Sequence, residues 1–104
     1  MKSLDIPSTV SSISWAAFKN SGLEVLDLSK CTLKYTNSET CEGCTNLKKV
    51  ILPEGLKSVG FEDYYNCTSL EEVILPSTLE SIGDYAFAYT NIKTLIIPEN
   101  VTSI

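Results

Sequence analysis

Residues 70–92 read LEEVILPSTLESIGDYAFAYTNI, and this stretch is one complete unit of a repeat that fills nearly the whole 104-residue chain. The apolar positions of this unit recur in the units before and after it; here they hold Leu70, Val73, Leu75, Leu79, Ile82 and Phe87. The prolines after the first apolar run keep the same spacing, with 23 residues from Pro53 to Pro76 and 22 from Pro76 to Pro98. A fixed period in the twenties, with one short strand per unit, is the signature of a solenoid.

The repeat divides the chain into one domain, 1–104, of about four and a half units that are 22–24 residues long. We place the units at residues 1–22, 23–46, 47–69, 70–91 and 92–104. Because no unit can bury its apolar face alone, the units must stack to build a continuous core. The first strand starts almost at once and the last unit stops halfway, without polar caps, so we expect a fragment of a longer array.

Each unit is expected to run once around the solenoid. Residues 73–75 alternate inward, outward and inward, as a strand does, and Pro76 ends the strand because it has no N–H for the next ladder bond. The run around Ile82 returns along the opposite wall, and DYAF, residues 84–87, forms a turn or a short helical piece on the back. We therefore predict an α/β-type repeat solenoid with a parallel sheet on one face.

The second unit departs most from the repeat. Ser29 replaces the proline, Cys41 replaces the aromatic residue, and the polar Thr36 occupies an apolar position. We expect the local stability minimum in this unit. In the third unit Asp63 stands at the position of Ala86, and we interpret this acid as a loop cap.

Composition argues against several functions. The net charge is −5, and the chain contains no arginine and no histidine, so nucleic acid is not an expected partner. No apolar run approaches the roughly 20 residues of a membrane span, and the first residues form no basic and apolar leader, so we expect neither membrane insertion nor a signal peptide. No general base or activated nucleophile is recognisable, so the sequence predicts neither an enzyme nor a cofactor.

Cysteines and small polar residues share one position of the repeat. Cys44 and Cys67 lie three residues before Leu47 and Leu70, and Ser21 and Thr90 hold the equivalent places. We expect this column to hydrogen-bond the backbone of adjacent loops. A zinc site or a disulfide involving the CEGC motif, 41–44, is the alternative, but no histidine or second CxxC completes a metal site, so we predict free, semi-buried thiols and no metal.

Four short motifs carry a family resemblance: Ile97-Pro98, Ile82-Gly83, Ala86-Phe87 and Cys67-Thr68-Ser69-Leu70. They make the whole chain similar to the BspA-like, or Treponema-type, leucine-rich repeat. The resemblance implies a curved, right-handed solenoid and no catalytic residues. It also implies a cell-surface or extracellular location and adhesion to a protein, including host or matrix glycoproteins, because many relatives of this kind are surface proteins of bacteria and protists.

A binding face is expected on the outside of the sheet. One outward column changes from acids in the first two units to isoleucine in the last three; it holds Asp5, Asp27, Ile51, Ile74 and Ile96. With their polar neighbours, these isoleucines define the predicted protein-binding residues, which are Lys49, Ile51, Glu72, Ile74, Thr94 and Ile96. Exposed apolar patches often mark interaction sites, although isoleucine also simply favours strands. We therefore predict a protein-interaction module, with a structural spacer in a longer array as the alternative.

The convex side and the two end strands allow further interpretations. Tyr65, Tyr85 and Tyr89 fall on the convex side, where they could stack on sugars or serve as ordinary surface residues. Uncapped strands at residues 4–6 and 95–97 predict end-to-end or swapped self-association.

Two N-glycosylation sequons begin at Asn66 and Asn100. Such short motifs also arise by chance, so the sequence leaves their use open.

Overall fold

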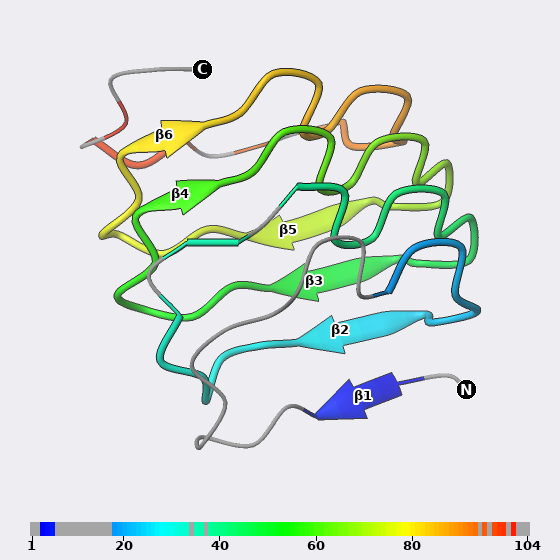
Figure 1. The fold of residues 1–104 in the computed structure, drawn as a ribbon, viewed down its shortest axis with the longest axis horizontal. Helices are drawn as coiled ribbons and strands as arrows, with labels where there is room; N and C mark the ends of the chain where they lie inside the picture. Colours follow the sequence, from blue (N-terminus) through cyan, green and yellow to red (C-terminus); the bar gives the residue numbers. More distant parts are fainter. Residues whose placement is uncertain are drawn as a thin grey trace.

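The computed structural model describes residues 18–33, 35–36, 38–93, 95, 97–99 and 101, and the backbone of residues 3–5. Four short strands form one parallel sheet: β1 (Ser3–Asp5), β2 (Val25–Asp27), β3 (Lys49–Ile51) and β5 (Glu72–Ile74). They pair in chain order, and β1 and β5 lie at opposite edges of the sheet (Figure 1). The parallel sheet that the repeat predicts is therefore confirmed.

The strand register follows the repeat columns. Leu26 pairs with Val50, which pairs with Val73, and all three point into the core. One residue further on, Asp27, Ile51 and Ile74 pair in the same order on the outer surface. The predicted alternation along the strand is thus confirmed, because successive side chains of a strand point to opposite faces.

A second, smaller parallel sheet forms the opposite wall from β4 (Ser58–Val59) and β6 (Ser81–Ile82). Val59 and Ile82 point inward between the two sheets, and they meet the leucines of the larger one in a single core. Figure 1 shows β4 and β6 on the other side of the coil from β3 and β5. The return of the chain on a second wall is confirmed.

Turns, rather than helices, close each coil on the back of the described part of the chain. They occupy residues 38–43, 61–66 and 84–89, and their backbones pair with one another from coil to coil. Cys41 donates its N–H to the Asp63 carbonyl at 2.7 Å, and Tyr64 donates to the Ala86 carbonyl at 2.8 Å. Within the described residues no helix is long and apolar enough to cross a membrane.

Glycine is required where neighbouring coils come closest. A Cβ atom on Gly83 would lie 2.7 Å from the Phe61 nitrogen and 2.8 Å from the Gly60 carbonyl carbon. Both neighbours are backbone atoms that cannot move aside without opening the ladder. This explains the glycine position of the repeat by steric approach of one coil to the next.

Gly83→Ala should therefore destabilise the protein by about 1–3 kcal/mol, the usual range for forcing extra atoms into a packed interior. Urea unfolding monitored by circular dichroism measures the change. Gly22→Ala is the matched control, because a Cβ atom on Gly22 meets nothing within 4 Å. Equal stabilities of the two variants would contradict the steric explanation.

Candidate protein-binding face

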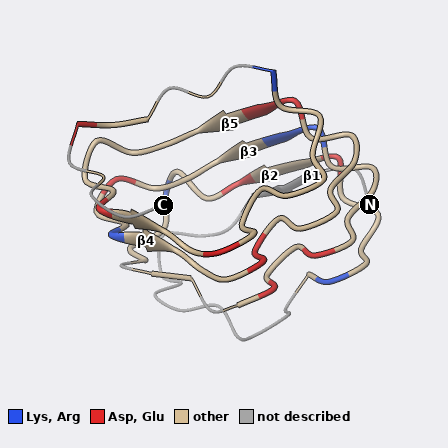
Figure 2. Ribbon diagram, turned by 90° about the horizontal axis from the view of Figure 1, so that it is seen from above, with Lys and Arg blue, Asp and Glu red and all other residues tan. Residues whose placement is uncertain are grey.

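The outer surface of the larger sheet brings most of the predicted binding residues together. Ile74 is 43% exposed, and the partly exposed Ile51 lies beside it in register. Lys49 and Glu72 pair in the same way two positions earlier, on the same face, with 3.8 Å between the Lys49 Nζ and Glu72 Oε1 atoms. Figure 2 shows basic and acidic segments interleaved along β2, β3 and β5. The face is therefore an apolar strip beside opposite charges.

Two of the predicted residues, Thr94 and Ile96, lie outside the described residues. Ile97 is described, and it lines a hollow with the inward residues Ile82 and Phe87, although 39% of its surface is exposed.

A groove beside β5 adds concavity to this face. Its volume is about 580 Å³, and it is lined by Glu54, Glu71, Glu72, Val73, Ile74, Leu75, Ser77 and Pro98. The lining combines apolar side chains with three glutamates. The sequence did not predict the groove, because its shape depends on how residues from three different units meet.

On β2 the same outward column holds Asp27, whose carboxylate binds the backbone of the turn that follows the strand. The Asp27 carboxylate accepts a hydrogen bond from the Ser29 N–H at 2.9 Å. Hydrogen bonding to Ser29 holds the pKa of Asp27 below its ordinary value. Asp27 therefore stays ionised at neutral pH and limits the apolar strip to the later strands.

The cysteine column forms the predicted hydrogen-bond ladder. The Cys44 thiol donates to the Phe18 carbonyl at 2.9 Å, and the Cys67 thiol donates to the Cys41 carbonyl at 3.0 Å, so each links its turn to the preceding one. Thr90 bonds within its own turn instead, to the Phe87 carbonyl. Cys41, Cys44 and Cys67 are buried free thiols.

The acidity of these thiols follows from their surroundings. Burial raises the pKa of Cys67 to about 12. A hydrogen bond with Cys41 lowers the pKa of Cys44 to about 6, against the effect of burial, so Cys44 donates to the Phe18 carbonyl only in its protonated form. Because Cys44 has no exposed surface, a reagent reaches it only when the turn opens. The structure thus gives these cysteines a packing and bonding role.

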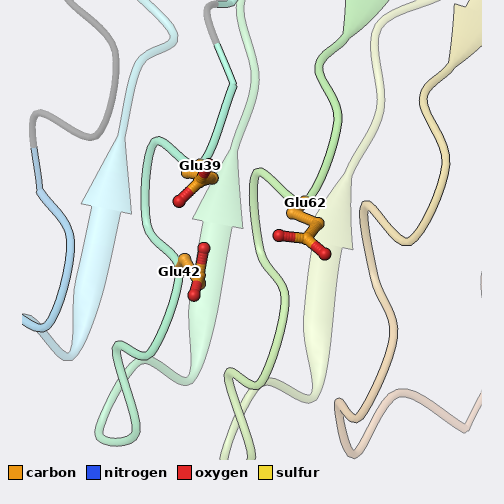
Figure 3. A group of neighbouring side chains, drawn as sticks. All are labelled: Glu39, Glu42 and Glu62. Carbon is orange, nitrogen blue, oxygen red and sulfur yellow. The ribbon is translucent and has the colours of Figure 1, made fainter.

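Three glutamates converge on the back of the protein, and we call them the acidic group: Glu39, Glu42 and Glu62 (Figure 3). Their carboxylate oxygens lie within 4.8 Å of one another. Lys19 already supplies a cation there, with its Nζ atom 3.1 Å from Glu39 and 3.8 Å from Glu42. Burial and the neighbouring Glu39 raise the pKa of Glu42. This arrangement is a surface ion-pair cluster and carries no metal assignment.

Comparison with known families fits this geometry. The family model for the BspA type leucine rich repeat region matches residues 1–104 in six copies. The chain belongs to the BspA-type leucine-rich repeat family. No relative among curated proteins matches it at a significant level.

Solved structures of bacterial leucine-rich repeat proteins share the fold of this chain. A leucine-rich repeat protein from Bacteroides ovatus superposes with a TM-score of 0.87 at 28% identity, over 99% of this chain and 29% of its own length. A leucine rich cell surface protein from Faecalibacterium prausnitzii gives 0.75 at 28% identity, over 100% of this chain and 35% of its own. The T. pallidum leucine-rich repeat protein, 22% identical, shares the fold with a TM-score of 0.87 over 98% of this chain and 50% of its own. The chain thus spans about a third of the first of these relatives.

The two polar departures from the BspA-type columns, Thr36 and Asp63, meet in the core. The Thr36 hydroxyl donates to one Asp63 carboxylate oxygen, and the Gly60 N–H donates to the same oxygen at 2.7 Å. The Thr40 hydroxyl and N–H donate to the other oxygen at 2.9 and 3.2 Å. Asp63 has no exposed surface, and its interpretation as a cap is confirmed, because it holds two loops together.

This pairing changes the expectation for the second unit. Thr36 at an apolar position looked like a defect, but its hydroxyl has a buried partner in the next unit. Whether the local stability minimum lies here stays a prediction. The signal that could have revealed the pair was the occurrence of two polar exceptions in neighbouring units.

Asp63→Ala should cost about 2–4 kcal/mol of unfolding free energy, because it leaves several buried donors unsatisfied. Thr36→Val alone removes one donor. Since both residues belong to one network, the double variant should be more stable than the sum of the two losses predicts, by about 0.5–3 kcal/mol. Urea unfolding of the four proteins measures this coupling. Asp84→Ala, at an exposed acid of the next turn, is the control, and strictly additive losses would refute the coupling.

Lowering the pH should raise the unfolding free energy of the wild type relative to that of the Asp63→Asn variant. Burial raises the pKa of Asp63 in the folded protein, although hydrogen bonds from Thr36, Thr40 and Gly60 oppose the shift. The folded state therefore takes up a proton at higher pH than the unfolded chain, whose carboxyl keeps the ordinary value of 3.8. As pH falls through the folded pKa toward that value, the unfolding free energy of the wild type should rise relative to the variant, which lacks this titration.

Urea unfolding of both proteins at a series of pH values between about 7 and 4 tests this expectation. A wild-type advantage that shrinks on acidification would show that the network stabilises the ionised carboxylate.

Proposed function

We propose that this chain is a non-enzymatic protein-interaction module that binds another protein through the outer face of its larger sheet. The observation that carries the proposal is the exposed strip of Ile51 and Ile74 beside the Lys49–Glu72 ion pair and the groove along β5. Side chains on paired strands are held at fixed spacing, so a partner meets a surface that is already arranged. The full site also includes Thr94 and Ile96, the next members of the same columns.

The character of the face favours a protein partner. An apolar strip with a charged margin provides the area that association requires, while the charges set orientation and exclude unsuitable partners. The groove also gives one partner side chain a place to insert beside Ile74. One structural relative is described as a cell surface protein. By extension we place this module at the cell surface, with a host or matrix glycoprotein as its partner.

A spacer role is the second candidate. The chain covers only 29% of the Bacteroides ovatus protein and 28% of the Eubacterium ventriosum protein that it resembles, so these coils form part of a longer array in such proteins. In a stack whose stability is a sum of neighbouring contacts, some coils serve only to separate others. The two functions differ in whether the isoleucine strip is required for binding.

The variant Ile51→Lys, Ile74→Lys and Ile96→Lys should lose the partner while it keeps its fold. Lysine at an exposed strand position costs little stability, but an uncompensated charge in the middle of an apolar contact costs affinity, about tenfold or more for each buried position. Surface plasmon resonance with the immobilised chain against purified matrix and cell-surface glycoproteins measures binding. Thermal unfolding checks the fold.

Tyr35→Lys is the matched control, because Tyr35 is 65% exposed and pairs with Ser58 on the opposite wall. Loss of binding in the triple variant alone supports the proposal. Retained binding in the triple variant would place the site elsewhere, and a large drop in thermal midpoint would show that the strip belongs to the core. No binding by any folded form supports the spacer role.

A further inference from the structure

A second surface lies on the turns at the back of the protein, away from the larger sheet. Its aromatic patch consists of Phe61, Tyr65, Tyr85 and Tyr89, from the turns that follow β4 and β6. The exposed fractions are 44% for Phe61, 63% for Tyr85 and 69% for Tyr89. Figure 1 shows these two turns side by side. Large apolar groups gathered on a surface in this way are unusual unless they contact something.

The rings form corners rather than a flat platform. Phe61 and Tyr85 meet edge to face, with ring centroids 6.4 Å apart and an interplanar angle of 78°. Tyr65 and Tyr89 do the same at 5.4 Å and 87°. Ring faces that meet at a right angle can both contact one compact cation, which is how aromatic cages recognise charged nitrogen groups.

The backbone beneath two of these tyrosines is strained. Tyr85 and Tyr89 both have φ near +59°, in the left-handed region that side chains disfavour. In other units the position of Tyr89 holds Asn20, Gly43 and Asn66, all residues that tolerate this conformation better. A bulky aromatic residue at such a place opposes stability, and residues of this kind occur at binding sites more often than elsewhere.

The acidic group continues this surface into the preceding turn. The Glu39 and Gly43 N–H groups donate to the carbonyls of Phe61 and Tyr65, each at 2.9 Å, so the acidic turn is bonded directly to the aromatic one. In repeat register Glu62 stands next to Tyr85, and Glu42 stands next to Tyr65. Burial, the neighbouring Tyr89 and the charges of Glu62 and Glu42 raise the pKa of Tyr65. In Figure 2 most of the charged segments on this side of the ribbon are acidic.

We propose that the aromatic patch binds a basic peptide segment of a partner protein, with arginine or lysine side chains against the rings and their charge toward the acidic group. This site is independent of the sheet face. Right-angled rings and adjacent carboxylates both favour a cation, through cation–π contact and charge complementarity. A neutral sugar has no charge to complement the carboxylates, and it stacks best on a flat ring face. Arginine suits the site best, since its planar guanidinium also stacks on aromatic rings.

Fluorescence anisotropy with a labelled peptide of alternating glycine and arginine, (Gly-Arg)4, tests the proposal. The chain should bind it more tightly than (Gly-Glu)4, and added salt should weaken the interaction. The variant Tyr85→Asn/Tyr89→Asn removes two rings and places a residue that tolerates positive φ at both positions. Its affinity should fall about tenfold, as expected from about two- to fivefold for each exposed cation–π contact.

Two further variants make the result decisive. Tyr35→Asn removes an equally exposed tyrosine that pairs with Ser58 of β4 and is not part of the aromatic patch, so this variant should bind (Gly-Arg)4 like the wild type. Glu62→Gln keeps the shape of the side chain but removes its charge, and it should lower the affinity for (Gly-Arg)4 about twofold, which is the effect of one exposed charge pair. Circular dichroism confirms that each variant is folded.

Unchanged affinity of the Tyr85→Asn/Tyr89→Asn variant for (Gly-Arg)4, or equal binding of (Gly-Glu)4 by the wild type, would overturn the proposal. So would displacement of the peptide by neutral cellohexaose, because it would identify the rings as a sugar platform. If the double tyrosine variant unfolds, Glu62→Gln and the comparison of the two peptides still decide the question.

Discussion

Backbone pairing between one coil and the next is the constraint on which the structure depends. Neighbouring coils are joined along the larger sheet, along the smaller sheet and along the turns, where Cys41 and Tyr64 donate to the following coil. Three lines of bonds fix the distance between coils, and that distance leaves no room for a side chain at Gly83. Every inward position must then pack against the same position of its neighbours, which is why apolar residues recur at a fixed period.

Much of the fold could be predicted because these contacts are periodic. The register of Leu26, Val50 and Val73, the outward Ile51 and Ile74, and the thiol ladder of Cys44 and Cys67 all follow from one-unit shifts of the sequence. Features that break the period could not be predicted in this way. The Thr36–Asp63 pair joins two different columns, and the groove along β5 needs the shapes of several units at once.

The same regularity separates scaffold from function. Inward columns are occupied by whatever fills the space between coils, so they carry little information about partners. Outward positions on the strands and turns are not restricted in this way, and here they differ sharply: the sheet face combines isoleucine with balanced charge, and the turn side combines aromatic rings with acids. Because each coil contacts only its neighbours, both surfaces would persist in a longer array such as those of the relatives.

Departures from the repeat therefore fall into two kinds, and the difference helps to separate stability from binding. Thr36 and Asp63 depart together and satisfy each other inside the core, so together they can be explained by folding. Tyr85 and Tyr89 hold a positive φ that bulky side chains disfavour, and among the described residues each makes an edge contact with one other ring. Folding therefore explains Thr36 and Asp63, whereas Tyr85 and Tyr89 lower the stability of the fold. A loss of stability at an exposed, charged surface is best explained by a ligand whose binding offsets it.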